Sequence, residues 1–90
     1  YALSDRDEIF THIEMENPRA AVQVDQQIVL AARRLIDFPE SGRLGRIAGT
    51  RELVISRTPY IAAYVVTAEH VRILRVLHGA QMWPDEIVTE

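Results

Sequence analysis

Cysteine is absent from the 90-residue chain, and its absence excludes several classes of site. Disulfide bonds, zinc–thiolate centres and thiol nucleophiles all require it. The three histidines, His12, His70 and His78, are widely separated in the sequence and do not form a metal-binding motif. We therefore expect no metal ion and no cofactor.

Long uncharged hydrophobic runs are absent as well. The longest such run covers residues 58–68, far short of the roughly 20 residues that a membrane-spanning helix needs. The chain opens with Tyr1 instead of methionine and soon reaches Asp5 and Arg6, so no signal peptide is visible. We expect one cytoplasmic domain over residues 1–90, no contact with a membrane, and a native N-terminus that lies before Tyr1.

Lysine is the third absence, because all ten basic residues are arginine. Residues 43–82 hold six arginines against only Glu52 and Glu69, whereas the segments on either side are acidic and the net charge is −3. A GC-rich genome accounts for the missing lysine. The clustering indicates that the second half binds carboxylates or phosphates, which a guanidinium contacts through two parallel hydrogen bonds.

Apolar spacing predicts two helices in the first half of the chain. The first covers residues 2–15, with Ser4 either capping it or lying inside it. The second begins with Asn17 as its N-cap and Pro18 at its first position, and it ends near Asp37 because Pro39 disfavours helical geometry at the residue before it. A connection this short makes the two helices an antiparallel hairpin.

Three strands are predicted after a glycine-rich loop at residues 39–49. They cover residues 51–56, 60–67 and 71–78, and the short breaks between them indicate an antiparallel sheet. The fold class is therefore α+β, an antiparallel helical hairpin packed on a small antiparallel sheet. Strict alternation places Arg72 and His78 on one face of their strand. It likewise places Arg51 and Arg57 on one face of the strand that begins at residue 51.

The last two predicted strands are largely apolar on both faces, although one helical hairpin covers only one face. We expect a partner chain on the second face, the alternative being that residues 79–90 fold back over it. Trp83 would then either close the end of the core or stand exposed as an anchor. Arg75, on an otherwise apolar face, needs a carboxylate from a helix or from a partner.

Several sequence runs resemble one bacterial family. They are Gly-Thr-Arg-Glu-Leu-Val at 49–54, Arg-Thr-Pro-Tyr-Ile at 57–61 and Arg-Val-Leu-His-Gly-Ala-Gln-Met-Trp-Pro at 75–84, and upstream Asp-Glu-Ile-Phe at 7–10 and Asn-Pro-Arg-Ala-Ala at 17–21. Together they resemble the RelE/ParE superfamily of toxins from type II toxin–antitoxin modules. Its members usually begin with a strand before the first helix, whereas this chain begins at or inside that helix. We expect that strand to be missing through truncation.

The resemblance implies a toxin that is neutralised by a cognate antitoxin encoded by an adjacent gene. RelE-like members cut messenger RNA on the ribosome, whereas ParE-like members inhibit DNA gyrase and are not nucleases. The ribonuclease branch places lysine and arginine on the strands, at positions that best match Leu53 and Ile61 here. The ParE-like branch is therefore favoured, with DNA gyrase as the target and growth inhibition as the outcome.

Candidate site residues follow from these two mechanisms. A ParE-like toxin would bind its antitoxin or target through Arg51, Arg57, Arg72, Arg75 and Trp83. A RelE-like ribonuclease, acting on the ribosome and messenger RNA, would use Arg51, Arg75 and His78, although a histidine at a strand end is more often structural. A basic RNA-binding module and a purely structural interaction domain remain further alternatives. Tyr60 and Tyr64 are expected to pack against the hairpin with their hydroxyls in water.

Overall fold

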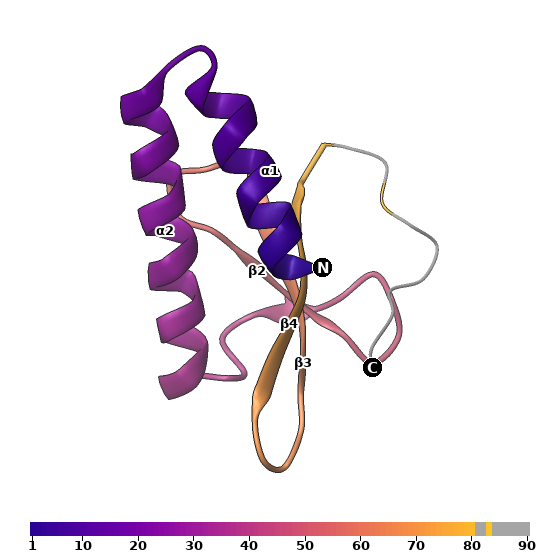
Figure 1. Cartoon of the computed structure of the whole chain (residues 1–90). Helices are drawn as coiled ribbons and strands as arrows, with labels where there is room; N and C mark the ends of the chain where they lie inside the picture. The colour runs from indigo at the N-terminus through magenta and orange to yellow at the C-terminus, as the bar shows by residue number, and fades with distance from the viewer. Residues whose placement is uncertain (81–82, 84–90) are drawn as a thin grey trace.

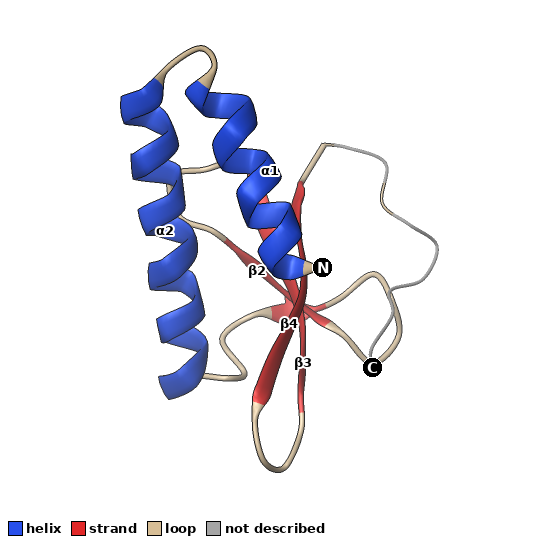
Figure 2. Ribbon diagram, viewed as in Figure 1, coloured by secondary structure: helices blue, strands red, loops and turns tan. Residues whose placement is uncertain are grey.

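The computed structural model describes residues 1–80 and 83. It has the two helices and three longer strands in the order that the sequence predicts, together with one short strand that was not predicted. The elements are α1 (Ala2–Glu14), α2 (Pro18–Asp37), β1 (Arg43–Leu44), β2 (Arg51–Val54), β3 (Tyr60–Val66) and β4 (Val71–His78). The sheet order is β1-β2-β3-β4, with every pair antiparallel. Both helices lie on the same side of the sheet (Figures 1 and 2). The predicted α+β fold is confirmed.

The two helices begin at different kinds of N-cap. Helix α1 begins at Ala2 with Tyr1 as its N-cap, so it passes through Ser4. Helix α2 is capped by the Asn17 side chain, which accepts a hydrogen bond from the backbone N–H of Ala20 at 3.1 Å. In the described part of the chain, no helix has the length and hydrophobicity that crossing a lipid bilayer requires.

An ion pair joins the two helices to each other, and an apolar stripe packs the hairpin against the sheet. Arg6 donates to the Asp25 carboxylate at 2.6 and 2.8 Å, which joins α1 to α2; these hydrogen bonds hold the pKa of Asp25 below its ordinary value. On α2, the residues Ala21, Ile28 and Leu35 are spaced by seven and are buried. The helix-facing core is formed by Ile28, Ile55, Tyr60, Ala62 and Val76, with Ile9 and Ile13 of α1 packed against it.

The loop predicted at residues 39–49 contains a short strand that periodicity did not reveal. In β1, Arg43 pairs with Glu52 and Leu44 pairs with Arg51. Two residues are too few for an alternating pattern, so only the pairing with β2 defines this strand. β2 itself ends at Val54, earlier than predicted, and Arg57 lies in the following turn with φ of 63°. Arg57 is therefore outside the strand, and the prediction that it shares a strand face with Arg51 is wrong.

β4 carries a bulge that changes which of its side chains face the helices. The register pairs Ala63 with Arg75 but Tyr64 with Ile73, so Leu74 is an extra residue. Leu74 packs with Ala63 on the second face of the sheet, and Val76 joins the helix-facing core. The strict alternation predicted for this strand therefore fails after Ile73.

The same bulge separates Arg72 from His78. Arg72 pairs with Val65, whereas His78 pairs with Tyr60. Residues 60 and 65 of the uninterrupted strand β3 lie on opposite faces, since their separation is odd. The prediction that Arg72 and His78 share a face is therefore wrong. The His78 ring instead lies edge-on to Tyr60, with 5.5 Å between the ring centroids.

The second face of the sheet is covered, at its buried centre, by the chain itself. Ala63 and Leu74 are packed there by Ile47 of the loop between β1 and β2, by Val65, and by Trp83. The indole N–H of Trp83 donates to the backbone carbonyl of His78 at 3.3 Å. Trp83 thus closes this part of the core, which agrees with the alternative that residues 79–90 fold back over the second face. The other residues of that segment, apart from Gly79 and Ala80, lie outside the described residues.

Glu52 fastens the covering loop to the sheet. Its side chain is almost fully buried, and the residue is only 3% exposed. It accepts hydrogen bonds from the backbone N–H of Arg46 at 2.7 Å, from the Arg46 guanidinium at 3.1 and 3.3 Å and from Arg43 at 3.1 Å. The Arg46 guanidinium also lies 3.7 Å from the ring centroid of Trp83. One carboxylate therefore holds two arginines, and through Arg46 it supports the indole.

Tyr64 fixes the loop that follows α2. It is 0% exposed, its hydroxyl donates to the carbonyl of Pro39 at 2.8 Å, and it accepts from the backbone N–H of Gly42 at 2.9 Å. The expectation that this hydroxyl lies in water is wrong, because the loop folds over it. A Cβ atom at Gly42 would come within 2.6 Å of the hydroxyl oxygen, so the close approach requires glycine.

Asp5 satisfies the edge of β4 beside the bulge. Its carboxylate accepts from Arg75 at 2.6 and 2.9 Å and from the backbone N–H of Val76 at 2.9 Å. The predicted pairing of Arg75 with a helix carboxylate is confirmed, and its hydrogen bonds with Asp5 raise the pKa of the guanidinium further above its ordinary value.

Replacing Asp5 by alanine should lower the free energy of unfolding by about 2–4 kcal/mol, because the half-buried Arg75 and the Val76 N–H lose their acceptor. Urea unfolding measures this change. Asp7→Asn, on the exposed side of the same helix, is the matched control and should change stability by less than about 0.5 kcal/mol. Equal effects of the two substitutions would show that the Asp5 contacts do not stabilise the fold.

The Glu52 network should make stability depend on acid pH. Burial alone would raise the pKa of Glu52, but hydrogen bonds from Arg46 and Arg43 outweigh burial and hold it below the ordinary value of 4.5. The contribution of Glu52 is therefore present above pH 4.5 and is lost as pH falls through the lower folded-state pKa.

Glu52→Gln should destabilise the protein by about 1–3 kcal/mol at pH 7, and the difference from the wild type should shrink as the pH falls below 4.5. Thermal unfolding across pH 3–7 checks this, and Glu69→Gln in the exposed turn after β3 serves as the control. A difference that stays constant over this pH range would contradict the role assigned to the carboxylate.

Candidate functional site

Two of the predicted site arginines are occupied inside the fold. Arg51 lies on β2 opposite Tyr64 and donates to the carbonyl of Gly42 at 2.8 Å. Arg75 is held by the Asp5 carboxylate, as described above. Both guanidiniums therefore form hydrogen bonds inside the protein that stabilise the structure.

Arg57 and Arg72 are both exposed, but Arg57 lies in a turn outside the sheet whereas Arg72 lies on β4 opposite Val65. Arg57 occupies the turn between β2 and β3, and no ion pair to it occurs within the part of the chain that the structure describes. Its φ of 63° lies in the left-handed region, which costs about 1 kcal/mol or more for a residue other than glycine. Such backbone strain is common at functional positions, so Arg57 is the stronger candidate for contact with a target.

His78 makes contacts within the fold at the end of β4. It is half-buried, its Nδ1 accepts a hydrogen bond from the backbone N–H of Ala80 at 3.0 Å, and its ring contacts Tyr60. Burial raises the pKa of Tyr60 above its ordinary value of 10.0. His12 and His70 are exposed. Among the described residues, no group of three histidine or acidic side chains is placed to hold a metal ion.

The structure brings His78 and Arg75 together but surrounds them with acids. Both line a hollow of about 100 Å³ whose other walls include Asp5, Glu8 and Tyr60. Two carboxylates beside one arginine make this hollow unfavourable for a phosphodiester, which needs positive charge around it. Arg51, the third member of the proposed ribonuclease set, does not line the hollow.

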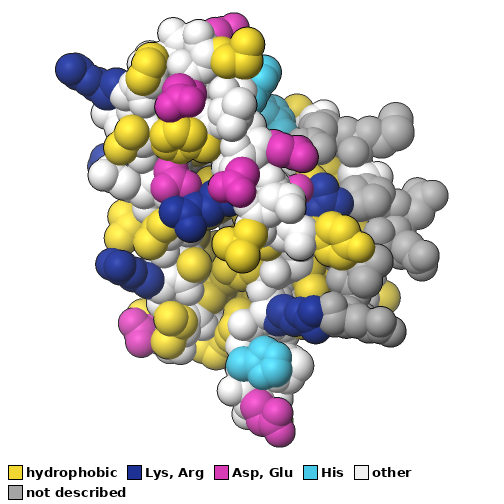
Figure 3. All heavy atoms as spheres, viewed as in Figure 1, with side chains coloured by type: hydrophobic (Ala, Val, Ile, Leu, Met, Phe, Trp, Pro, Cys, Tyr) yellow, Lys and Arg dark blue, Asp and Glu magenta, His cyan; other side chains and the backbone are white. Residues whose placement is uncertain are grey.

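Larger grooves border α2, and the sequence analysis named none of them. Two of these grooves differ in what lines them. The first, of about 460 Å³, lies between the start of α1, the end of α2 and β4, and most of its lining is aliphatic, including Leu3, Val29, Ala32, Ile36, Val71 and Ile73. Figure 3 shows hydrophobic side chains gathered where the lower end of α2 approaches the start of α1.

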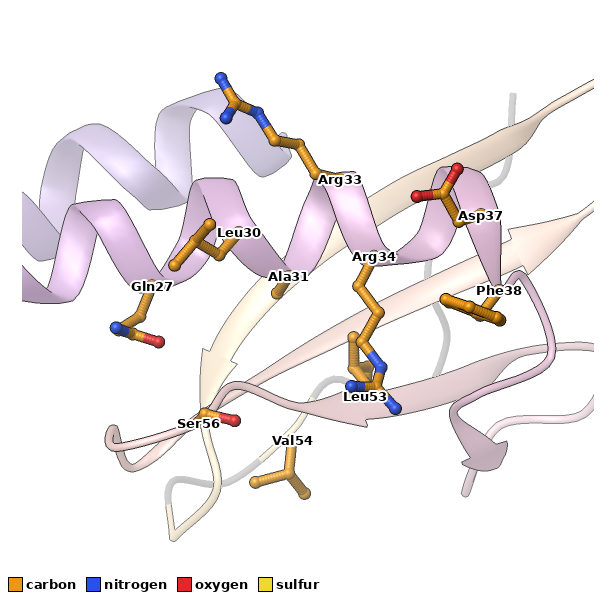
Figure 4. A pocket seen from close by; sticks show the side chains of 10 residues that line it. All are labelled: Gln27, Leu30, Ala31, Arg33, Arg34, Asp37, Phe38, Leu53, Val54 and Ser56. Carbon is orange, nitrogen blue, oxygen red and sulfur yellow. The ribbon is translucent and has the colours of Figure 1, made fainter.

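The second groove, of about 580 Å³, lies between α2 and β2. In Figure 4, Gln27, Ala31 and Arg34 point from α2 toward β2, and Arg34 reaches toward Leu53. Arg34 lies in the acidic half of the sequence, outside the arginine cluster of residues 43–82, so charge clustering does not point to it. The signal that could have found it is its helical spacing from Ala31 and Leu30, three and four residues earlier.

Comparison with known proteins connects these features to a family. Residues 1–83 match the family described as ParE toxin of type II toxin-antitoxin system, parDE. Toxin Y4kP of Sinorhizobium fredii (strain NBRC 101917 / NGR234) is 46% identical over 83 residues, which span 92% of this chain and 85% of that protein. Toxin RelE2 of Caulobacter vibrioides (strain ATCC 19089 / CIP 103742 / CB 15) is 37% identical over 81 residues, 90% of each chain.

A solved structure shares the fold. A chain of the structure titled "Chromosomal ParDE TA system from P. aeruginosa" superposes with a TM-score of 0.74 and 29% sequence identity, over 83% of this chain and 84% of that one. The family match covers both helices, all four strands and Trp83. The protein therefore belongs to the ParE toxin family, within the RelE/ParE superfamily of type II toxin–antitoxin systems.

Proposed function

We propose that this toxin, as a single cytoplasmic domain over residues 1–90, inhibits growth by binding DNA gyrase and does not cleave messenger RNA. The observation that carries the proposal is the environment of Arg75 and His78. Arg75 is bound by Asp5, and the hollow that it shares with His78 also contains Glu8. Arg75 and His78 are two of the three residues that a RelE-like site would use.

Cleavage of RNA by its own 2′-hydroxyl requires a base, an acid and cations around the phosphate. The strand positions that best match the cation-bearing positions of ribonuclease members are Leu53 and Ile61, and Ile61 is buried. A site without its cations loses several kcal/mol of transition-state stabilisation. The match to the ParE family over residues 1–83 supports the same choice.

One observation favours the ribonuclease alternative. Arg34 reaches from α2 toward Leu53 and so brings a guanidinium near the position where the strand lacks one (Figure 4). The residues that line this groove include Asp37 and Ser56 but no histidine or tyrosine. A general acid with a pKa near neutrality is therefore missing from the lining, and gyrase binding stays the preferred proposal.

Induction of the toxin in cells should separate the two mechanisms. We expect gyrase-cleaved DNA and a DNA-damage response, with messenger RNA intact by primer extension. His78→Gln, verified as folded by thermal unfolding, should remain toxic because His78 contributes packing and a hydrogen bond to Ala80. Rapid cleavage of messengers on translating ribosomes, lost in His78→Gln, would replace the proposal with the ribonuclease mechanism.

Arg57→Asn should weaken growth inhibition while preserving the fold, since asparagine tolerates the left-handed backbone at this turn. The melting temperature should change by no more than a few degrees, in keeping with an exposed substitution. Arg19→Asn, which removes the same charge from an exposed position on α2, is the control. Toxicity reduced equally by both variants would indicate a general effect of charge and remove Arg57 from the target surface.

A further inference from the structure

A small apolar cluster lies on the second face of the sheet, separate from the helix-facing core. Ala63 and Leu74 are 0% and 4% exposed there, whereas Ile47 and Trp83, which pack against them, are only half-buried. The loop that carries Ile47 lies across the sheet from the helices (Figure 1). The two clusters share no residue, and a region with few buried apolar contacts opens at a lower free energy than the whole domain.

The loop at residues 45–50 is a compact turn whose two ends are joined. The N–H of Gly45 donates to the carbonyl of Thr50 at 2.8 Å, and the Thr50 hydroxyl donates to the carbonyl of Ile47 at 2.7 Å. Gly49 has φ of 82°, in the left-handed region that glycine adopts without strain. Because these hydrogen bonds lie within the loop, we expect its tip to move as one piece.

Arg46 connects the tip of this loop both to the sheet and to the indole. Its backbone N–H and its guanidinium donate to the Glu52 carboxylate, and the same guanidinium lies 3.7 Å from the ring centroid of Trp83. A planar guanidinium can bind a carboxylate along its edge while its flat face stacks on an aromatic ring. The placement of Trp83 therefore depends on the charge of Glu52, through Arg46.

The charged groups nearest to Glu52 come from two elements. Arg43 of β1 and Arg46 of the loop donate to it, whereas β3 presents Ala63 opposite it. Arg72 of β4 belongs to the same face, farther along the sheet. Burial raises the pKa of Glu52, but the hydrogen bonds from the two arginines outweigh burial and hold it below 4.5. The carboxylate is therefore charged above pH 4.5 and becomes neutral as the pH falls through the lower folded-state pKa.

We propose that Glu52, Arg46 and Trp83 form an acid-sensitive clasp over the second face, which opens locally when Glu52 is protonated while the helices stay packed on the sheet. A neutral carboxyl group no longer attracts the guanidinium, so the loop tip and the indole leave the sheet together. Opening exposes Ala63 and Leu74, and acid thereby gives the toxin an apolar surface that is covered at neutral pH. The clasp involves only this chain and is independent of gyrase and of the antitoxin.

Trp83 is the only tryptophan of the chain, so its fluorescence reports on the clasp in the full-length protein. At pH 7, Arg46→Gln should raise the fraction of Trp83 accessible to acrylamide by about threefold or more, because the ring loses its stacked cation. Glu52→Gln should have the same effect, and both variants should show red-shifted emission. Their far-UV circular dichroism should match that of the wild type, since the helix-facing core is intact.

Arg43→Gln is the matched control, because it removes the other arginine on Glu52 and leaves the stacked Arg46 in place. Its emission and its accessibility to acrylamide at pH 7 should equal those of the wild type. Arg46 is exposed, so its substitution keeps the test available even if Glu52→Gln does not fold.

Acid titration tests the trigger. In the wild type, the emission of Trp83 should shift to the red as the pH falls below 4.5, before any loss of the helical circular dichroism. Arg46→Gln and Glu52→Gln should show the red-shifted emission already at pH 7 and no further shift over this range.

Three results would overturn the proposal. The first is wild-type emission that changes only together with the helical signal, which would mean that the clasp does not open by itself. The second is equal accessibility of the indole in Arg46→Gln and Arg43→Gln. The third is an acid-induced shift of emission that persists in Glu52→Gln, or in Arg46→Gln where Glu52→Gln does not fold.

Discussion

The extra residue in β4 determines how the rest of the molecule is arranged around the sheet. With Leu74 added between Ile73 and Arg75, Leu74 packs on the second face and Val76 packs under the helices. The bulge also leaves the Val76 N–H at the outer edge of the sheet, where Asp5 of α1 accepts it together with the Arg75 guanidinium. The bulge thus decides which β4 side chains enter the core, and beside it Asp5 attaches the first helix and binds Arg75, one of the candidate site residues.

Arginine serves mainly as a structural residue in this chain. Arg43 and Arg46 bind Glu52, Arg6 binds Asp25, and Arg75 binds Asp5. A planar guanidinium donates several hydrogen bonds at once, so one side chain joins segments that are far apart in sequence. A small domain buries little apolar surface, and such joints add to a modest core. The clustering of arginines after residue 42 therefore reflects loop attachment at least as much as recognition.

The candidate binding surfaces lie on different parts of the molecule and differ in chemistry. Arg57 occupies a strained, exposed turn between β2 and β3. The groove between α2 and β2 offers accessible apolar side chains and Arg34, which forms no ion pair with any residue that the structure describes. By contrast, the hollow that contains Arg75 and His78 is small and acidic. A protein partner, and not a phosphate group, is the ligand class that the accessible features favour.

The sequence by itself determined the helices, the three longer strands, the family and the N-cap at Asn17. These depend on periodicity, capping and proline, which act over a few residues and are visible without a partner segment. The two-residue β1, the bulge at Leu74, the burial of the Tyr64 hydroxyl and the pairing of Asp5 with Arg75, 70 residues away, were decided by the tertiary structure. Alternation predicted that Arg75 needs a carboxylate but could not identify it, because which acid meets an arginine depends on how α1 is placed against β4. The groove at Arg34 was hidden for the same reason: its walls come from two elements that become neighbours only when the chain folds.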